Sequence, residues 1–464
     1  MIPLSVAEIA AVVDGEVHDD PDEVTVTGPV FIDTRTPEPG GLFAAFVGEH
    51  VDGHDHAAAA VRDGAAAVLG SRPTGVPTVV VPDPQAALGR LATHVLGLLT
   101  DLRVLAVTGS QGKTSTKDLL AALLADAAPT VATRGSFNNE LGLPVTVLRS
   151  DDATRFLLLE MGARGIGHLR TLCAIARPDV SLVLNVGKAH LGEFGTQDDI
   201  ATAKGELVEA LTEAGTAVLN ADDPRVAAMA ARTSARVLTF GTDAGADVRL
   251  GDVALDEDGH PSFTLAQGDE TAAVTLRLVG AHQAMNAAAA AAAGSAVGIG
   301  LAESADSLGR VETLSRWRME VRRRDDGVTV VNDAYNANPG SMEAGLEALV
   351  ALGGTSRRTV AVLGEMRELG ESATQEHETL GRLAVRLGVH RVVAVGDAAR
   401  GVHTGALEAG ATGEEAVHVA DNDAAVRWLD SELRPGDVVL LKASNGARLF
   451  DVAAAVLAGR EVGP

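Results

Sequence analysis

The stretch RVLAVTGSQGKTSTKDLLAALLADA (103–127) contains a short apolar strand pattern, a glycine-containing loop and a helical pattern in direct succession. Such a unit directs backbone N–H groups and the positive end of a helix at one point, which suits a phosphate group. Lys113 would add a cation for the β- and γ-phosphates, and Thr114 a hydroxyl for Mg²⁺. The common phosphate loop has a glycine five positions before Gly112, where this chain has Val107. The short spacing disfavours an ordinary kinase or GTPase, and a glycine turn with a surface lysine stays the alternative.

Length and patterning predict an α/β protein with several cores. A chain of 464 residues is long enough for about three domains. Short β-branched runs alternate with Ala- and Leu-rich helical patterns, which is typical of layers around mainly parallel sheets. We expect three blocks, residues 1–98, 99–314 and 315–464, the last of them Rossmann-like. The segment 241–279 alternates apolar and polar residues and predicts a β-hairpin inside the middle block.

Composition excludes several classes of function. The net charge of −25 disfavours a nucleic-acid partner, because a phosphate backbone needs a basic face. The single cysteine, Cys173, allows no intramolecular disulfide and indicates a reducing compartment. The first residues do not have the pattern of a signal peptide. The longest apolar run, 284–301, is mostly alanine and glycine, so we expect a tightly packed helix and no membrane insertion. These features predict a cytoplasmic protein.

Three polar residues follow predicted strands or lie on a predicted helix. Glu160 ends the strand pattern at 155–161, and His190 follows another in LNVGKAHLGEFG (184–195). Side chains at the carboxyl ends of parallel strands face the ligand crevice, so these two could bind a second Mg²⁺ or order the waters of the first. A salt-bridged carboxylate and a surface histidine are the alternatives. Lys204 lies on a predicted helix, where most lysines are solvated.

These motifs together resemble the Mur ligases, which add amino acids to peptidoglycan precursors. The match rests on TGSQGKTSTK (108–117), Glu160, LNVGKAHLGEFG, AKGEL (203–207) and NADDP (220–224). The short loop is the form of this family. Residues 31–55 and GSFNNELGLP (135–144) are similar to its UDP-binding and muramyl-peptide segments. The resemblance implies a UDP-muramyl-peptide-binding domain at 1–98, an ATP-binding domain at 99–314, and at 315–464 a domain that closes on ATP.

Two further motifs are similar to one branch of the family. DAYNANPGSM (333–342), and GEMRELG (364–370) followed by His377, resemble the members that add D-alanyl-D-alanine to UDP-N-acetylmuramoyl-tripeptide. The resemblance implies that the C-terminal domain binds the dipeptide and that the chain is a monomer. A ligase adding the third amino acid, diaminopimelate or lysine, is one alternative. A nucleotide-gated binding protein or inactive scaffold on the same fold is the other.

The resemblance also implies roles for individual residues. In the family's reaction the tripeptide carboxylate attacks the γ-phosphate of ATP, and the dipeptide amine then attacks the resulting acyl phosphate. The implied catalytic residues are Lys113, Lys204, Glu160 and His190. The implied Mg²⁺ ligands are Thr114, Glu160, His190 and, if carbamylated, Lys204. The implied nucleotide contacts are Gly109, Ser110, Gln111, Gly112, Lys113, Thr114, Ser115, Asn286, Arg318, Asp333 and Asn336. The implied muramyl-peptide contacts are Asp33, Thr34, Arg35, Asn138 and Asn139.

The chain departs from the family pattern at two places. Relatives commonly read Lys-Gly-Ser-Arg near the C-terminus, whereas this chain keeps Lys442 and Ser444 but has Asn445 next. Arg448 is the nearest arginine, and whether it replaces the lost guanidinium is open. Trp317 stands where many relatives have glycine, so the interdomain contact there is expected to differ.

Overall fold

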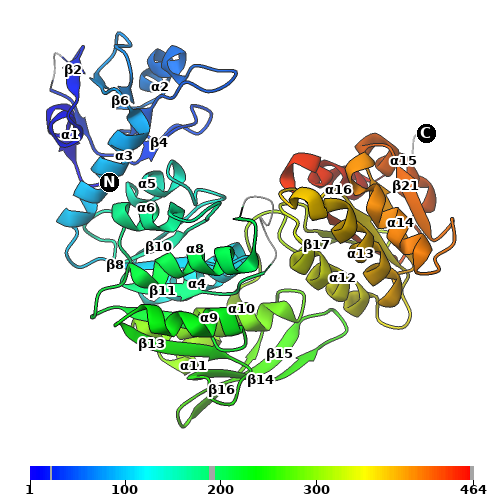
Figure 1. The fold of residues 1–464 in the computed structure, drawn as a ribbon. Coiled ribbons are helices and arrows are strands. Elements are labelled where there is room, and N and C mark those ends of the chain that lie inside the picture. The colour runs from blue at the N-terminus through cyan, green and yellow to red at the C-terminus, as the bar shows by residue number, and fades with distance from the viewer. Residues whose placement is uncertain (21–22, 188–193, 460–464) are drawn as a thin grey trace.

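The computed structural model describes residues 1–20, 23–187 and 194–459. The chain forms three successive α/β parts, each built on its own main sheet (Figure 1). The N-terminal and middle parts are stacked, and the C-terminal part lies to one side of the middle part (Figure 1). The predicted α/β class with mainly parallel sheets is confirmed.

The N-terminal part has a five-stranded sheet in the order β2-β7-β6-β5-β4. Only β2 runs antiparallel to its neighbour. The strands, with a separate β1–β3 pair, are β1 (Leu4–Ser5), β2 (Glu16–His18), β3 (Thr25–Val26), β4 (Val30–Phe31), β5 (Leu42–Ala44), β6 (Ala67–Gly70) and β7 (Thr78–Val80). The helices are α1 (Val6–Val13), α2 (Ala57–Arg62) and α3 (Pro84–Leu98). Asp83 caps α3 and Pro84 occupies its first turn, which explains why the helix begins there.

The middle part has a nine-stranded sheet in the order β16-β15-β14-β13-β12-β11-β8-β10-β9. Strands β8 to β14 pair in parallel, and β15 and β16 add an antiparallel edge. The strands are β8 (Arg103–Thr108), β9 (Thr130–Ala132), β10 (Phe156–Glu160), β11 (Val180–Val183), β12 (Thr216–Asn220), β13 (Arg236–Gly241), β14 (Val248–Leu255), β15 (Pro261–Gln267) and β16 (Glu270–Thr275). The predicted hairpin at 241–279 is therefore confirmed as the antiparallel edge of this sheet.

Helices cover both faces of the middle sheet. Its helices are α4 (Lys113–Ala127), α5 (Gly142–Val147), α6 (His168–Ile175), α8 (Gln197–Glu209), α9 (Pro224–Ala227), α10 (His282–Ala296) and α11 (Leu301–Arg310). Alternate residues of β8 belong to different cores: Val104 and Ala106 pack with α3, α5 and α6, whereas Leu105 and Val107 pack with α4 and α10. This period of two is what a strand buried on both faces requires.

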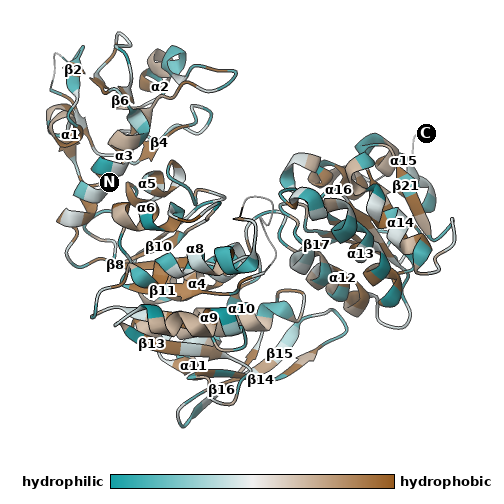
Figure 2. Cartoon of the chain, viewed as in Figure 1, coloured by the Kyte–Doolittle hydropathy of each residue, from teal (hydrophilic) through white to brown (hydrophobic). Residues whose placement is uncertain are grey.

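The alanine-rich run forms the buried helix α10, as predicted. Ala287 to Ala293 are all at most 1% exposed, and the small side chains let α10 pack closely on α4. Figure 2 shows β10 and β11 as mainly hydrophobic, α8 and α13 with many hydrophilic residues, and α10 as largely apolar. Within the described part of the chain, no helix combines the length and apolar content needed to cross a membrane.

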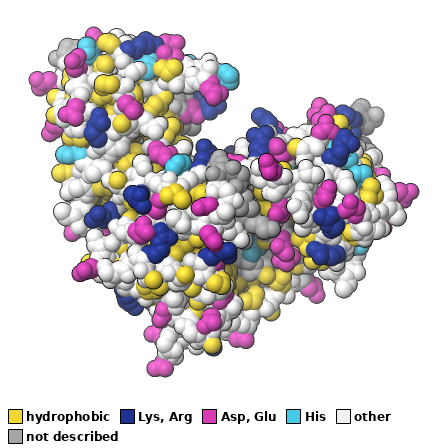
Figure 3. Space-filling view, viewed as in Figure 1, with side chains coloured by type: hydrophobic (Ala, Val, Ile, Leu, Met, Phe, Trp, Pro, Cys, Tyr) yellow, Lys and Arg dark blue, Asp and Glu magenta, His cyan; other side chains and the backbone are white. Residues whose placement is uncertain are grey.

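The C-terminal part has a six-stranded sheet in the order β17-β18-β22-β19-β20-β21, parallel except for β17. The strands are β17 (Glu320–Arg323), β18 (Thr329–Asn332), β19 (Thr359–Leu363), β20 (Arg391–Val395), β21 (Ala416–Val419) and β22 (Val438–Lys442). The helices are α12 (Pro339–Gly353), α13 (Ala373–Arg386), α14 (Arg400–Glu408), α15 (Asn422–Glu432) and α16 (Leu449–Ala458). Acidic and basic side chains are interspersed over the face in Figure 3, which is hollowed between the N-terminal and C-terminal parts.

Candidate active site at the phosphate loop

The phosphate loop lies between the end of β8 at Thr108 and the start of α4 at Lys113. Gly112 has φ +79°, a conformation that favours glycine. A Cβ atom there would also lie 2.7 Å from Asn286 Oδ1. The first N–H groups of a helix have no intrahelical acceptor, so those at the start of α4 face the cavity in front of the loop. This arrangement suits an anion.

Asn185, just beyond β11, fixes the conformation of the loop. Its Oδ1 accepts hydrogen bonds from the N–H groups of Ser110 and Gln111, both at 3.0 Å, and its Nδ2 donates to Gln111 O at 3.1 Å. The N–H of Gly187 donates to Ser110 Oγ at 2.8 Å. Two loop N–H groups are therefore used for support of the loop. Asn185 lies within LNVGKAHLGEFG (184–195), but no feature of that sequence distinguishes it as a support of the loop.

A cavity of about 620 Å³ opens in front of the loop and is lined by residues from distant parts of the sequence. The lining includes Ser110, Gln111, Gly112, Lys113, Thr114, Ser115, Asn138, Asn139, Glu160, Lys204, Arg318, Tyr335, Asn336, Asn338, Glu368 and Asn445. The structure thus brings most of the predicted nucleotide, metal and catalytic residues together. Gly109 and Asp333 do not line the cavity but are bonded to residues near it. Gly109 O accepts a hydrogen bond from Lys113, and Asp333 is linked to Asn336 through Lys442.

Lys113 bends back over the loop. Its Nζ donates to Gly109 O at 2.7 Å. Burial lowers the pKa of the ammonium group, while the charges of Glu160 and Glu368 raise it and that of Arg318 lowers it. The side chain is half-buried in the cavity wall, so the surface-lysine alternative is wrong.

Glu160 is a buried carboxylate with one oxygen left over. It is 3% exposed, and Oε1 accepts a hydrogen bond from Asn138 Nδ2 at 2.8 Å. Among the described residues Oε2 has no hydrogen-bond partner. A buried carboxylate oxygen is costly unless it meets a donor or a cation. A hard divalent ion such as Mg²⁺ prefers such an oxygen, and Thr114 Oγ1 lines the same cavity, so the donor set fits the metal.

Lys204 is buried, at 3% exposure, which makes the solvated-lysine alternative wrong. Burial and the nearby charge of Lys113 hold the pKa of Lys204 well below its usual range. The amine is consequently neutral over more of the pH range than an ordinary lysine, and a neutral amine is the nucleophilic form.

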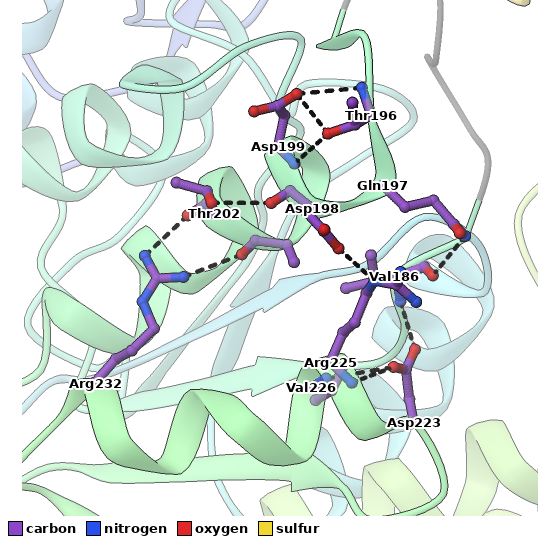
Figure 4. A network of polar contacts seen from close by, with 11 residues as sticks. Val186, Thr196, Gln197, Asp198, Asp199, Thr202, Asp223, Arg225, Val226 and Arg232 are labelled. Atoms are coloured by element: carbon purple, nitrogen blue, oxygen red, sulfur yellow. Dashed lines mark hydrogen bonds and ion pairs between the residues drawn. The ribbon is translucent and has the colours of Figure 1, made fainter.

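The helix that carries Lys204, α8, is fixed at its first turn by a polar network (Figure 4). Asp223 caps α9 through the N–H of Arg225 and also accepts the N–H of Val186 at 2.7 Å. Arg225 Nε in turn donates to Asp198 Oδ1 on α8 at 3.0 Å. This network links the NADDP motif to the end of β11 and to the start of α8.

Arg232 holds the middle of the same helix. Its guanidinium donates to the carbonyl oxygens of Ala201, at 3.1 Å, and Thr202, at 2.9 Å. A Cβ atom at Gly205 would lie 1.8 Å from Arg232 Nη1, so the residue after Lys204 must be glycine for the guanidinium to fit. Lys204 is positioned by this contact as well as by the helix itself.

The segment between α11 and β17 carries Arg318 onto the loop. Arg318 Nη2 donates to Thr114 Oγ1 at 3.1 Å, and its guanidinium lies 4.3 Å from the ring centroid of Tyr335. The N–H of Ser315 donates to Asp118 Oδ2 on α4 at 2.7 Å. This segment therefore contacts α4 through both Arg318 and Ser315. Of these two residues, only Arg318 was predicted from the sequence.

Asp333 and Asn336 join the C-terminal strands to this segment. Asp333 Oδ1 accepts the N–H of Met319 at 3.1 Å, and Oδ2 accepts Lys442 Nζ at 2.5 Å. Lys442 also donates to Asn336 O at 3.1 Å. Lys442 of the C-terminal motif thus holds the DAYNANP segment in place.

Both departures from the family pattern have structural consequences. Trp317 has φ +60°, a conformation that favours glycine, and its ring stacks on Phe450 at 4.1 Å. Arg448 Nε donates to Asp451 at 2.7 Å and does not line the cavity, whereas Asn445 does. Arg448 therefore does not supply a guanidinium to this site.

Several predicted residues lie away from the cavity or have other contacts. Asp33, Thr34 and Arg35 form an exposed turn beyond β4 in which Arg35 donates to both carboxylate oxygens of Asp33. Asn286 lies beneath the loop, where Oδ1 accepts Thr116 Oγ1 at 3.2 Å. Asn139 Oδ1 accepts the N–H of Gly142.

His190 lies outside the described residues. His282, one turn before Asn286, begins α10. Burial lowers the pKa of His282 to about 4, against the opposing charge of Asp333.

The middle of the three α/β parts contains a strand, a short phosphate loop and a helix in succession. This arrangement defines a class of nucleotide-binding proteins. Three family models match the chain: Mur ligase middle domain at residues 107–294, Mur ligase, glutamate ligase domain at 317–445, and Mur ligase family, catalytic domain at 29–95. The chain belongs to the Mur ligase family.

Similar proteins cover almost the full chain. It is 49% identical to the UDP-N-acetylmuramoyl-tripeptide–D-alanyl-D-alanine ligase of Mycobacterium tuberculosis (strain ATCC 25618 / H37Rv), over 99% of this chain and 98% of that protein. The enzyme of the same name from Bacillus subtilis (strain 168) is 34% identical over 97% and 98%.

Two solved structures have the same fold. MurF from Acinetobacter baumannii has a TM-score of 0.86 at 30% identity and covers 98% of this chain and 99% of its own. The MurF ligase of Thermotoga maritima in complex with ADP has a TM-score of 0.79 at 30% identity and covers 93% and 97%.

Proposed function

We propose that this protein is an ATP-dependent ligase that joins D-alanyl-D-alanine to UDP-N-acetylmuramoyl-tripeptide in peptidoglycan precursor synthesis. The names and full-length coverage of the relatives support this reaction. The observation that carries it is the cavity in front of the phosphate loop, where Lys113, Glu160 and Lys204 of the middle part meet Arg318 and Asn336 of the C-terminal part. A site built from two domains suits a reaction that joins two substrates.

The three parts take separate roles in this proposal. Residues 1–98 bind the UDP-muramyl peptide, with Asp33, Thr34 and Arg35 among the contacts. Residues 99–314 bind ATP, and residues 315–464 close on the nucleotide and bind the dipeptide. The ion pair between Glu38 and Arg134, at 3.9 Å, connects the first part to the segment that carries Asn138 and Asn139.

The first chemical step brings two anions together. The tripeptide carboxylate attacks the γ-phosphorus of ATP, the bond to the β-phosphate oxygen breaks, and an acyl phosphate and ADP result. Lys113 and the N–H groups at the start of α4 bind the phosphate oxygens and stabilise the charge as it moves. Thr114, Glu160 and His190 are the residues that would hold Mg²⁺, which would neutralise charge on the phosphates when bound. Lys204 would join them as a carbamate, since its lowered pKa provides the neutral amine needed to form one.

In the second step the dipeptide amine attacks the acyl carbon, the carbon–oxygen bond to phosphate breaks, and the proton that the amine loses passes to the departing phosphate. Water competes with the amine for the acyl phosphate. Arg318, which contacts Thr114 from the interdomain segment, and Asp333, which holds that segment, keep the C-terminal part over the loop. Closure of this kind excludes water from the intermediate. The monomeric state and the cytoplasmic location remain predictions.

Purified protein with ATP, Mg²⁺ and UDP-muramyl-tripeptide is expected to release phosphate on addition of D-alanyl-D-alanine. Release with diaminopimelate or lysine alone would instead assign it the third addition.

Lys113→Ala is expected to lower kcat/KM by about 10²–10³-fold or more, because a cation that stabilises transferred phosphate is removed. Unchanged ligation by this variant would overturn the role given to the loop. A chain that binds ATP but forms no amide under any of these conditions would be the binding protein or scaffold.

A further inference from the structure

The loop GEMRELG (364–370) follows β19 and has no role in the steps above. Two of its side chains, Met366 and Leu369, are 2% and 3% exposed and pack into the C-terminal core. Glu368, between them, lines the cavity in front of the phosphate loop. Burial of the neighbours on both sides determines where this carboxylate lies.

Hydrogen bonds hold the loop from two directions. The N–H of Met366 donates to His377 Nε2 at 2.9 Å, and the other ring nitrogen of His377 donates to Ala373 O at 2.7 Å. Burial lowers the pKa of His377, which keeps the ring neutral and able to accept. On the other side, the N–H of Arg367 donates to Ser444 Oγ at 3.0 Å. The loop is fixed before any substrate arrives.

Glu368 has an unfavourable backbone conformation. Its φ is +65°, in the left-handed region where a Cβ atom is crowded by the backbone. Such conformations persist where the surrounding contacts enforce them, and they gather at ligand sites. A glycine at this position would fit the turn better. The strained glutamate is therefore better explained by its side chain than by the turn.

The charge of Glu368 faces the phosphate loop. Among the described lining residues of the C-terminal part, the charged side chains are those of Arg318 and Glu368. Lys113 and Glu368 line the same cavity, and the charge of Glu368 raises the pKa of Lys113 in part, against the larger lowering by burial. A cation placed between the loop and the C-terminal wall would meet this carboxylate.

We propose that Glu368 binds the ammonium group of the incoming dipeptide and accepts one of its protons, so that the nitrogen, now with a lone pair, is directed at the acyl phosphate. This inference rests on the proposed function and extends it to the second substrate. A charged hydrogen bond from an ammonium group to a carboxylate is short and directional, and it sets the amine on the side of the cavity opposite the phosphate. In this arrangement the middle part binds the phosphate groups, and the loop at 364–370 binds the ammonium group.

The test is a comparison of wild type with Glu368→Gln, which keeps the shape and removes the charge. The KM for D-alanyl-D-alanine is expected to rise about 10- to 100-fold, the range of one charged hydrogen bond, with the KM for ATP changed less than about twofold. The hydroxyl analogue D-lactoyl-D-alanine, which lacks the ammonium group, should inhibit both proteins equally. Hydroxylamine trapping of the acyl phosphate, which needs no dipeptide, should also be unchanged.

Two further variants control for folding and charge. Glu371→Gln makes the same change at an exposed position three residues along and is expected to behave as wild type. Glu368→Gly relieves the strain, so its thermal midpoint should not fall while its KM for the dipeptide rises. If wild type makes product and Glu368→Gln keeps the wild-type KM for the dipeptide, the inference is wrong although the proposed function stands. If wild type forms no product with the dipeptide, the proposed function itself fails.

Discussion

The middle and C-terminal parts both place their working residues at the carboxyl ends of parallel strands, but they use different chemistry. The loop after β8 relies on backbone N–H groups, glycine and Lys113, which together suit anions. The loop after β19 presents a side-chain carboxylate, Glu368, held by buried neighbours. The same sheet architecture thus supplies an anion site on one side of the cavity and a cation site on the other.

The largest effect is expected at Glu160, which is buried and, among the described residues, has no hydrogen-bond partner for Oε2. Glu160→Gln is expected to lower kcat by about 10²–10³-fold, because a charged metal ligand becomes a neutral amide. The Mg²⁺ concentration for half-maximal activity should rise as well. A Mg²⁺ titration of activity measures both. A variant with normal Mg²⁺ dependence would separate Glu160 from metal binding.

Much of this anion side could be predicted from the sequence, because its signals are local. Strand, glycine and lysine follow one another within 103–127, and a strand end carries Glu160. The loop's supports were harder to predict. Asn185 is 74 residues from Gln111, and only the parallel pairing of β11 with β8 brings them together.

The cation side was less predictable for a physical reason. The position of Glu368 depends on the packing of Met366 and Leu369 and on the hydrogen bond from Met366 N–H to His377 on α13. These contacts follow no periodic pattern in the sequence. A glutamate in the sequence does not indicate a left-handed backbone, as a glycine would, so the φ of Glu368 could not be predicted. Likewise, the side chain of Lys204 is buried by the tertiary fold, whereas its helical pattern suggested a solvated residue.

Lys204 allows a pH test of the anion side. Its folded pKa is lowered, so between that value and the unfolded value near 10.5 the unfolded chain binds more protons than the folded protein. Stability should therefore rise with pH in this window by up to about 1.4 kcal/mol per pH unit from this group. Lys204→Met is expected to remove that contribution and flatten the slope. Urea denaturation at pH 7, 8 and 9 measures it, and equal slopes would show that Lys204 is charged in the folded state.

A substitution at Asn185 measures how far nucleotide binding depends on a fixed conformation of the phosphate loop. Asn185→Ala removes the acceptor of two loop N–H groups, and it should lower the free energy of unfolding by about 1–3 kcal/mol. The freed loop is expected to raise the KM for ATP while the KM for D-alanyl-D-alanine stays the same. Denaturation and substrate titrations together give this result. An equal rise in both KM values would mean that the loop supports the whole cavity.

The smallest effect is expected at Trp317, on the segment that joins the two sides. Trp317→Gly relieves a left-handed backbone that costs about 1–2 kcal/mol, and it removes a ring stack on Phe450 worth about 0.5–1.5 kcal/mol beyond burial. Because these terms oppose each other, we expect stability to change by about 1 kcal/mol or less. Activity should fall modestly, by about threefold, since Arg318 next to it loses a fixed neighbour at the loop. Trp317→Ala keeps the left-handed backbone and also loses the stack, so it should be less stable than the glycine variant; the reverse order would show that the left-handed backbone at this position costs no stability.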